Sequence, residues 1–157
     1  MKKLLFETPV SQRKGNLLNI FLTQFLILIS LVACSGIPIS YYDATTYTQL
    51  TSLKAETTTL VGSFDTKPFT ENRERIEATT LSLKKAYEYE KGKGNPNSDT
   101  EKQFTKVVGL FMDDVQYYKE DGPGALGKKY FQEASVVLGQ AFDIAISTEN
   151  LKNKDKK

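Results

Sequence analysis

The sequence predicts an all-α fold, an antiparallel four-helix bundle, for the part of the chain that follows an apolar N-terminal segment. Four stretches of about 20 to 26 residues repeat apolar side chains at intervals of three to four, which is the period of an amphipathic helix. Polar connections separate these stretches, and short connections place consecutive helices antiparallel. We therefore expect one helical domain over residues 43–150.

The first helix is expected from Asp43 to about Phe64, because aspartate is a good N-cap and the apolar positions after it recur at helical spacing. Its many threonines oppose this prediction, since β-branched side chains lower helix propensity. A strand, however, would need strict alternation, which the apolar residues do not show. The predicted apolar face consists of Tyr47, Leu50, Leu53, Leu60, Val61 and Phe64.

The second helix follows a connection over residues 65–69, which contains Pro68. Thr70 is its predicted N-cap, and Glu71 and Glu74 suit the positive end of the helix dipole. Its apolar line is the least hydrophobic of the four, so we expect it to pack at the periphery. That line consists of Ile76, Thr80, Leu83 and Tyr87. The Gly- and Pro-containing tract 91–97 should end the helix and form the longest and most mobile internal loop.

The third helix carries the clearest start signal in the chain. The sequence Ser98-Asp99-Thr100-Glu101 predicts a capping box, in which the side chain at each end satisfies a free backbone amide at the other. The tract 121–124, which reads Asp-Gly-Pro-Gly, should terminate this helix. Its predicted buried face consists of Phe104, Val107, Val108, Phe111, Val115 and Tyr118.

The fourth helix is expected over residues 125–150 and has the widest apolar face, which predicts that it is the central helix. The face consists of Leu126, Tyr130, Phe131, Ala134, Val137, Leu138, Ala141, Phe142, Ile144 and Ala145. Residues 151–157 lack an apolar period and are rich in lysine, so we expect a basic, disordered tail. Its lysines serve either solubility or contact with anionic phosphates of lipid or cell-wall polymer.

The segment before the bundle has the three parts of a secretory signal: positive charges, an apolar region over residues 17–32, and small residues around Cys34. The positive charges are Lys2, Lys3, Arg13 and Lys14. Cys34 is the single cysteine of the chain and closes the run Leu31-Val32-Ala33-Cys34. This run resembles the lipobox of bacterial prolipoproteins.

The resemblance implies that the Cys34 thiol is alkylated with a diacylglyceryl group, that residues 1–33 are cleaved off, and that the new amine is acylated. Two or three acyl chains of the palmitate type hold a protein stably on a membrane, whereas one holds it marginally. Residues 34–42 would form a tether. The alternatives are simple secretion and an uncleaved transmembrane helix, although the apolar region spans only about 24 Å of a hydrocarbon core of about 30 Å.

The residue after the lipidated cysteine bears on localisation. Gram-negative lipoproteins retained at the inner membrane commonly have aspartate there, and this chain has Ser35. The resemblance therefore implies the periplasmic face of the outer membrane in a Gram-negative cell. In a Gram-positive cell it implies the outer leaflet of the cell membrane.

Charge and composition narrow the function classes. The 157 residues contain 21 basic and 19 acidic side chains, but the leader holds four of the bases and one of the acids, so residues 34–157 carry a net charge near −1. Without a clustered basic face, no nucleic-acid partner is expected. The chain has no histidine, which excludes imidazole-based catalysis and the usual zinc, di-iron and haem ligand sets.

The remaining motifs are better explained by structural roles than by catalysis or ligand binding. The glycines at positions 122, 124 and 127 match the G-x-G-x-x-G pattern, but no strand precedes them, which predicts an inter-helix turn. Two groups of carboxylates lie close together in the sequence: Glu71, Glu74 and Glu77, and Asp113 and Asp114. Paired carboxylates could bind a hard cation or cleave a glycoside, but we expect these side chains to be solvated. We predict no catalytic residue, metal or cofactor.

The tyrosines could line a ligand groove or a partner surface. The simpler expectation places Tyr47, Tyr87, Tyr118 and Tyr130 at the bundle margin with their hydroxyls in water, and Tyr41 and Tyr42 at the level of the lipid headgroups. The remaining tyrosines are Tyr89 and Tyr117.

Two functional hypotheses follow from the sequence. The first is a non-enzymatic lipoprotein that is attached to the membrane through Cys34 and acts by contact with an envelope protein, in an assembly or in the exclusion of incoming elements. The alternative is a ligand-binding or weakly enzymatic bundle that uses its acidic and tyrosine side chains.

Overall fold

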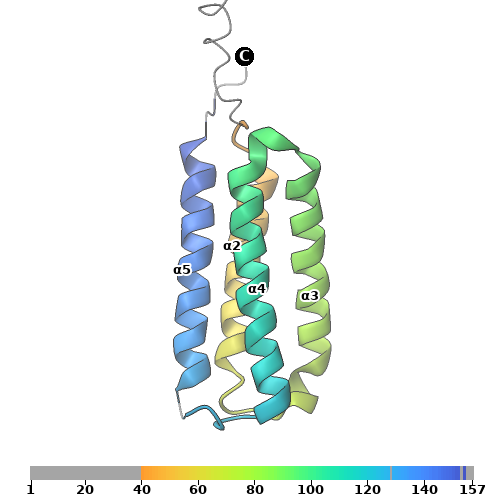
Figure 1. Ribbon diagram of the computed structural model, residues 1–157, viewed down its shortest axis with the longest axis vertical. Coiled ribbons are helices and arrows are strands. Elements are labelled where there is room, and N and C mark those ends of the chain that lie inside the picture. The colour runs from red at the N-terminus through yellow and green to blue at the C-terminus, as the bar shows by residue number, and fades with distance from the viewer. Residues whose placement is uncertain (1–39, 128, 153, 155–157) are drawn as a thin grey trace, which may run out of the picture. The chain divides into compact units, whose positions relative to one another are not determined.

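The computed structural model describes residues 40–127, 129–152 and 154, and these residues form a bundle of α-helices (Figure 1). The helices are α2 (Ala44–Gly62), α3 (Phe69–Gly92), α4 (Ser98–Asp121) and α5 (Tyr130–Leu151), and a short 3₁₀ helix, η1 (Asn95–Asn97), precedes α4. The predicted all-α, antiparallel four-helix fold is confirmed. Cys34, the predicted signal segment and most of the tether lie outside the described residues.

Each helix packs beside its neighbours in the chain, and α5 closes the ring by packing against α2. Helix α5 packs against α2 and α4, and these two contacts are the most extensive in the bundle. The predicted apolar face of the fourth helix is nevertheless too wide, because Leu126, Val137 and Ile144 are exposed. The core takes apolar side chains from every helix, including Leu50, Leu60, Leu83, Phe104, Phe111, Leu138 and Phe142.

Helix α2 begins as predicted, since the Asp43 carboxylate accepts a hydrogen bond from the Thr45 backbone N–H at 2.8 Å. The threonines fit the helix because their hydroxyls find acceptors in the preceding turn. Thr57 Oγ1 donates to the Leu53 carbonyl at 2.7 Å, and Thr58 Oγ1 donates to the Lys54 carbonyl at 2.7 Å. A threonine whose hydroxyl is satisfied in this way can be buried, as Thr57 is.

Two predicted helix caps are wrong. Helix α3 begins at Phe69 rather than after Thr70, because Pro68 supplies the extended backbone that precedes it. The capping box at the start of α4 does not form. The turn of η1 leads directly into α4, so Ser98 already has helical backbone angles instead of the extended conformation of a capping serine.

The tract 91–97 also differs from the predicted loop. Helix α3 ends at Gly92, only Lys93 and Gly94 separate it from η1, and the Asn97 side chain is buried. The buried face of α3 also differs from the prediction at one position, because Thr79 is buried in place of the expected Thr80. Tertiary contacts, rather than turn composition, therefore order this end of the bundle.

Helix α5 begins at Tyr130, five residues later than predicted. Gly124 and Gly127 have φ values of 75° and 115°, a left-handed conformation that interrupts a right-handed helix. Asp65, from the connection between α2 and α3, caps α5: its carboxylate accepts hydrogen bonds from the backbone N–H groups of Phe131 at 3.4 Å and Gln132 at 3.1 Å. The G-x-G-x-x-G match is the predicted inter-helix turn.

An aromatic cluster fills the bundle near these connections. The rings of Phe64 and Tyr118 are stacked, with centroids 4.0 Å apart, and Phe131 meets Phe64 edge-on at 5.4 Å. The prediction that the Tyr118 hydroxyl reaches water is wrong. Tyr118 is fully buried, and its hydroxyl donates to the Lys67 carbonyl at 2.5 Å and accepts from Asn72 Nδ2 at 3.1 Å.

Candidate functional site

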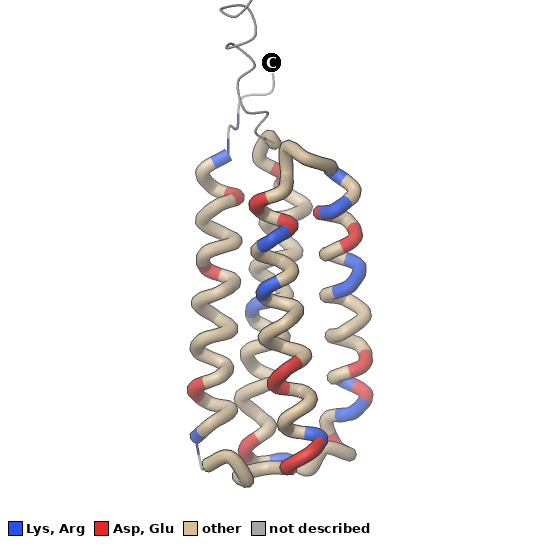
Figure 2. Tube along the Cα trace, in the orientation of Figure 1, with Lys and Arg blue, Asp and Glu red and all other residues tan. Residues whose placement is uncertain are grey.

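The predicted acidic candidates divide into exposed and buried groups. Glu71, Glu74 and Glu77 are exposed on α3, as expected, among the many other charges of that helix (Figure 2). Asp113 is exposed as well. Within the described part of the chain, no group of three or more acidic or other metal-ligating side chains is placed to hold a metal ion.

The prediction that Asp114 faces solvent is wrong: it is only 7% exposed. Asp114 follows Phe111 by three residues and precedes Tyr118 by four, so helical geometry places it on the buried side of α4. Of this pair, Asp113 is therefore exposed to solvent and Asp114 is buried at the edge of the core.

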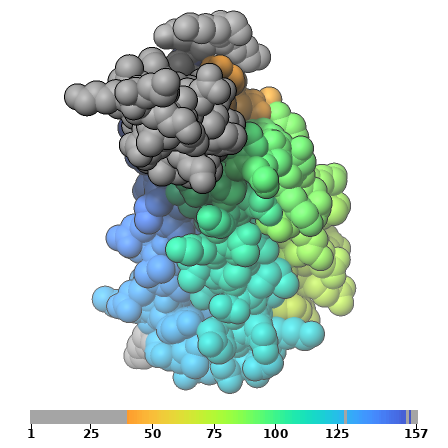
Figure 3. Space-filling view, turned by 45° about the horizontal axis from the view of Figure 1, so that its top comes forward, coloured from red at the N-terminus to blue at the C-terminus, as the bar shows by residue number. Residues whose placement is uncertain are grey.

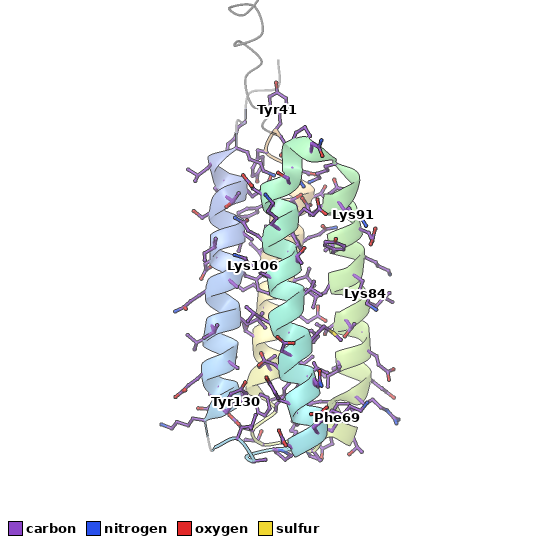
Figure 4. The ribbon with its side chains drawn as sticks, viewed as in Figure 1. Tyr41, Phe69, Lys84, Lys91, Lys106 and Tyr130 are labelled. Atoms are coloured by element: carbon purple, nitrogen blue, oxygen red, sulfur yellow. The ribbon has the colours of Figure 1, made fainter. Side chains whose placement is uncertain are left out.

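Asp114 lines a groove between α4 and α5, here called the α4–α5 groove, with a volume of about 290 Å³. Tyr130 stands at the α5 side of this groove, near the beginning of the helix (Figure 4). The other lining side chains are mostly apolar: Leu110, Glu133, Ala134, Val137 and Leu138. The groove therefore combines an aliphatic wall with carboxyl groups and a phenol.

Burial and the charge of Asp113 raise the pKa of the Asp114 carboxyl to about 6. Within the described residues, Asp114 has no hydrogen-bond donor and no cationic partner. Burial and the Asp114 charge likewise raise the pKa of the Tyr130 phenol. Both shifts indicate that negative charge in the groove is not compensated by the surrounding side chains.

The outer surface of α5 is unusually poor in charge. This helix contains no lysine or arginine, and Figure 2 shows it largely without charged positions. Val136, Val137 and Ile144 are 59%, 51% and 61% exposed, respectively. The α4 and α5 surfaces adjoin on one face of the bundle (Figure 3). Val137 both lines the groove between them and is half-exposed.

A second polar group, here called the end cluster, joins residues close to both ends of the described chain. Its members are Ser40, Asp43, Thr46, Glu90, Lys93, Asn97, Glu149 and Lys152. Glu90 is fully buried and accepts hydrogen bonds from Thr46 Oγ1 at 2.5 Å, Lys93 Nζ at 3.0 Å and Asn97 Nδ2 at 2.8 Å. Its charge is therefore well compensated.

Asn97 is the hub of the end cluster. Its Oδ1 atom accepts from Lys152 Nζ at 2.7 Å and from Ser40 Oγ at 3.1 Å. Lys152 also forms an ion pair of 2.6 Å with buried Glu149. The predicted solvated tail is thus wrong for Lys152, which is 8% exposed, whereas Leu151, the last residue of α5, is 86% exposed.

Lys93 and Asp43 complete the end cluster with a 2.8 Å ion pair. Burial alone would raise the pKa of Asp43, but hydrogen bonds from Lys93, Tyr89 and the Thr45 backbone outweigh it and hold the pKa well below its usual range. Burial alone would lower the pKa of Lys93, but its bonds to Asp43 and Glu90 outweigh it and raise the pKa. The end cluster is charged, paired and structural, whereas the α4–α5 groove contains the unpaired carboxyl.

Replacing Asp114 with asparagine should stabilise the fold at neutral pH. A carboxyl with a pKa of about 6 in the folded state and 3.8 in the unfolded state costs stability once it ionises. The cost is absent below pH 4, grows as the pH rises from 4 to 6, and reaches about 2 to 3 kcal/mol above pH 6. Urea unfolding followed by circular dichroism should show Asp114→Asn more stable at pH 7.5 and equal to wild type at pH 4.

The matched control is Asp113→Asn, which removes the same charge from the neighbouring exposed position. We expect a gain of about 0.5 kcal/mol or less, because surface substitutions are usually of that size. Equal gains from both variants would contradict the assignment of the stability cost to Asp114.

Comparisons of the chain with protein families, with proteins of curated function and with solved structures found no match. Among the described residues, no helix is long and apolar enough to span a membrane. The candidate site is therefore defined by its own geometry: a buried, unpaired carboxyl in an apolar groove, next to a charge-poor helix surface.

Proposed function

We propose that this protein is a bacterial lipoprotein that is anchored to a cell-envelope membrane by lipid on Cys34 and acts without catalysis, through contact of its helical bundle with an envelope protein. The observation that carries the contact role is the α5 surface, where Val136, Val137 and Ile144 are more than half exposed. Exposed apolar side chains next to a groove are typical of interaction surfaces.

The attachment of the tether supports the anchored role. The Ser40 backbone N–H donates to the Pro96 carbonyl at 3.1 Å, and the Asp43 N–H donates to Glu149 Oε1 at 2.6 Å. Ser40 lies six positions after Cys34, and a chain of that length reaches at most about 20 Å. A lipid on Cys34 would therefore keep the end cluster close to the membrane surface.

Metabolic labelling with an alkynyl fatty acid tests the anchor. Wild-type protein should be labelled and recovered with membranes, whereas Cys34→Ala should be unlabelled. The control is Ser35→Ala, which changes the adjacent residue and keeps the thiol. Equal labelling of wild type and Cys34→Ala would exclude lipid on this cysteine.

Site-specific photo-crosslinking in cells tests the contact. A photoreactive residue at Ile144 or Val137 on α5 should give a discrete adduct with an envelope protein. The matched control is Leu81 on α3, an apolar side chain that is 54% exposed on a highly charged helix. The same adducts at Leu81, or none at the α5 positions, would argue against α5 as the contact surface.

The alternative function, ligand binding by acidic and tyrosine side chains, is supported by one specific observation. Asp114 and Tyr130 line the same groove, and the described residues give Asp114 no partner.

A further inference from the structure

The Asp114 carboxyl is placed where a bound ligand, rather than another protein side chain, could provide its hydrogen-bond donor or counter-charge. A buried carboxylate normally has a cationic partner or several hydrogen-bond donors, because an uncompensated charge is costly in an apolar site. Asp114 has neither among the described residues, although it is 93% shielded from solvent and lines an open groove. The end cluster of the same bundle shows the usual solution, since Glu90 and Glu149 are both paired with lysines.

The charges around the groove favour a cation. On α4, the exposed Asp113 adds negative charge beside Asp114. On α5, Glu133 lines the groove, and Tyr130 presents a phenol. No lysine or arginine lines the groove, so each of its two walls contributes a carboxyl group and neither contributes a basic group.

The apolar lining favours an organic cation over a metal ion. Calcium and magnesium require six or more oxygen ligands, whereas most of the lining here is aliphatic, contributed by Leu110, Ala134, Val137 and Leu138. A volume of about 290 Å³ lies at the lower end of the range for ligand pockets and suits a short chain. The Tyr130 ring, which lines the groove, adds aromatic surface that attracts cations.

We propose that the α4–α5 groove is a binding site for an alkylammonium group, with the ammonium ion on Asp114 and its aliphatic stem along Leu110, Ala134 and Val137. This inference rests on the alternative function, ligand binding, and is independent of the anchor at Cys34. The same chemistry is carried by a free amine and by a lysine side chain of a partner protein.

Titration of the full chain in nonionic detergent with n-butylammonium chloride, followed by amide NMR shifts, tests the site. We expect saturable shifts at residues 110–118 and 130–138, with a dissociation constant on the order of 1 mM, which is reasonable for so small a ligand. The neutral isostere n-butanol should bind at least about tenfold more weakly, because it lacks the charge-assisted bond.

Substitutions assign the binding to Asp114. Asp114→Asn should weaken n-butylammonium binding about tenfold or more, whereas Asp113→Asn, with the same loss of charge, should change it by about twofold or less. Because Asp114→Asn removes a buried charge, it is expected to fold. The ¹³C shift of the Asp114 carboxyl gives a second readout: bound ammonium should lower its pKa from about 6.

The pH dependence of binding is also defined. Affinity should fall as the pH decreases from 7.5 to 5, because Asp114 becomes protonated. Glu133 lines the groove and Asp113 lies next to Asp114. If Asp114 is responsible, Glu133→Gln should show the same dependence of binding affinity on pH as wild type. A profile that persists in Asp114→Asn would overturn the assignment.

Two further probes distinguish the source of the ammonium. Tighter binding of N-acetyl-lysine methylamide than of cadaverine would indicate a partner lysine, and the reverse order would indicate a free amine. Either order supports the site. The proposal is overturned if n-butylammonium gives no saturable shifts, or if wild type and Asp114→Asn bind it equally. Neither result would affect lipid labelling at Cys34 or crosslinking at α5.

Discussion

Asn97→Ala will lower the free energy of unfolding by about 3 to 5 kcal/mol, because it removes two hydrogen bonds to charged groups, each worth about 1.5 to 3 kcal/mol. The Asn97 amide donates to the carbonyl and the carboxylate of Glu90, and its oxygen accepts from Lys152 and Ser40. Alanine cannot replace any of these bonds. Lys152 would keep only its ion pair with Glu149, and the Glu90 carbonyl and carboxylate would each lose one hydrogen-bond donor. Urea unfolding at pH 7 measures the change.

The control for this variant lies in the same turn. Asn95 is exposed in η1, and Asn95→Ala should change stability by about 0.5 kcal/mol or less. Hydrogen exchange adds a spatial test, since Asn97→Ala should accelerate exchange at the first turn of α2 and the last turn of α5. Equal destabilisation by the two variants would show that the turn, and not the Asn97 side chain, matters.

Phe64→Ala should also cost about 3 to 5 kcal/mol, the usual range for removing a buried phenylalanine. Phe64 lies just after α2 and is fully buried, where it stacks on Tyr118 and meets Phe131 edge-on. Its loss would leave a cavity and remove two aromatic contacts, each worth about 0.5 to 1.5 kcal/mol beyond burial. Thermal and urea unfolding of the purified protein measure the effect.

Leu126→Ala is the comparison for Phe64→Ala, because Leu126 also lies in an inter-helix connection but is 43% exposed. We expect a loss of about 0.5 kcal/mol or less. A similar loss for both variants would contradict the view that the aromatic cluster organises this end of the bundle.

The helices themselves were predictable because their apolar period is a local property of the sequence. Phe104, Val107, Phe111, Val115 and Tyr118 recur at intervals of three to four and are all buried. Helix boundaries were less predictable, since they depend on residues far away in the chain. The start of α5, for example, is capped by Asp65, which lies more than sixty residues earlier.

The buried polar residues were missed because polar side chains were assigned to the surface by type. A usable signal was present: Glu90 follows Ala86 by four residues and Glu149 follows Ala145 by four, which continues the buried line of each helix. Asp114 likewise lies on a buried line, three residues after Phe111 and four before Tyr118. The cations that pair with Glu90 and Glu149 lie three residues further along the chain, at Lys93 and Lys152. No lysine or arginine lies three or four residues from Asp114. What the sequence could not show is that Asn97 would join the two pairs, because it comes from another part of the chain.

The up-and-down order of the helices has a practical consequence for labelling the protein. Ser40 and Lys152, which lie close to the two ends of the described chain, are joined through Asn97. A reporter fused after the last residue of the chain would therefore follow Lys152 by a few residues, near the segment that we propose as the tether. A reporter inserted at Pro123, in the exposed turn after α4, would instead stand at the opposite end of α5, a helix about 33 Å long (Figure 1). With lipid on Cys34, as we propose, fluorescence quenching by labelled lipid should be stronger for the C-terminal fusion than for the insertion.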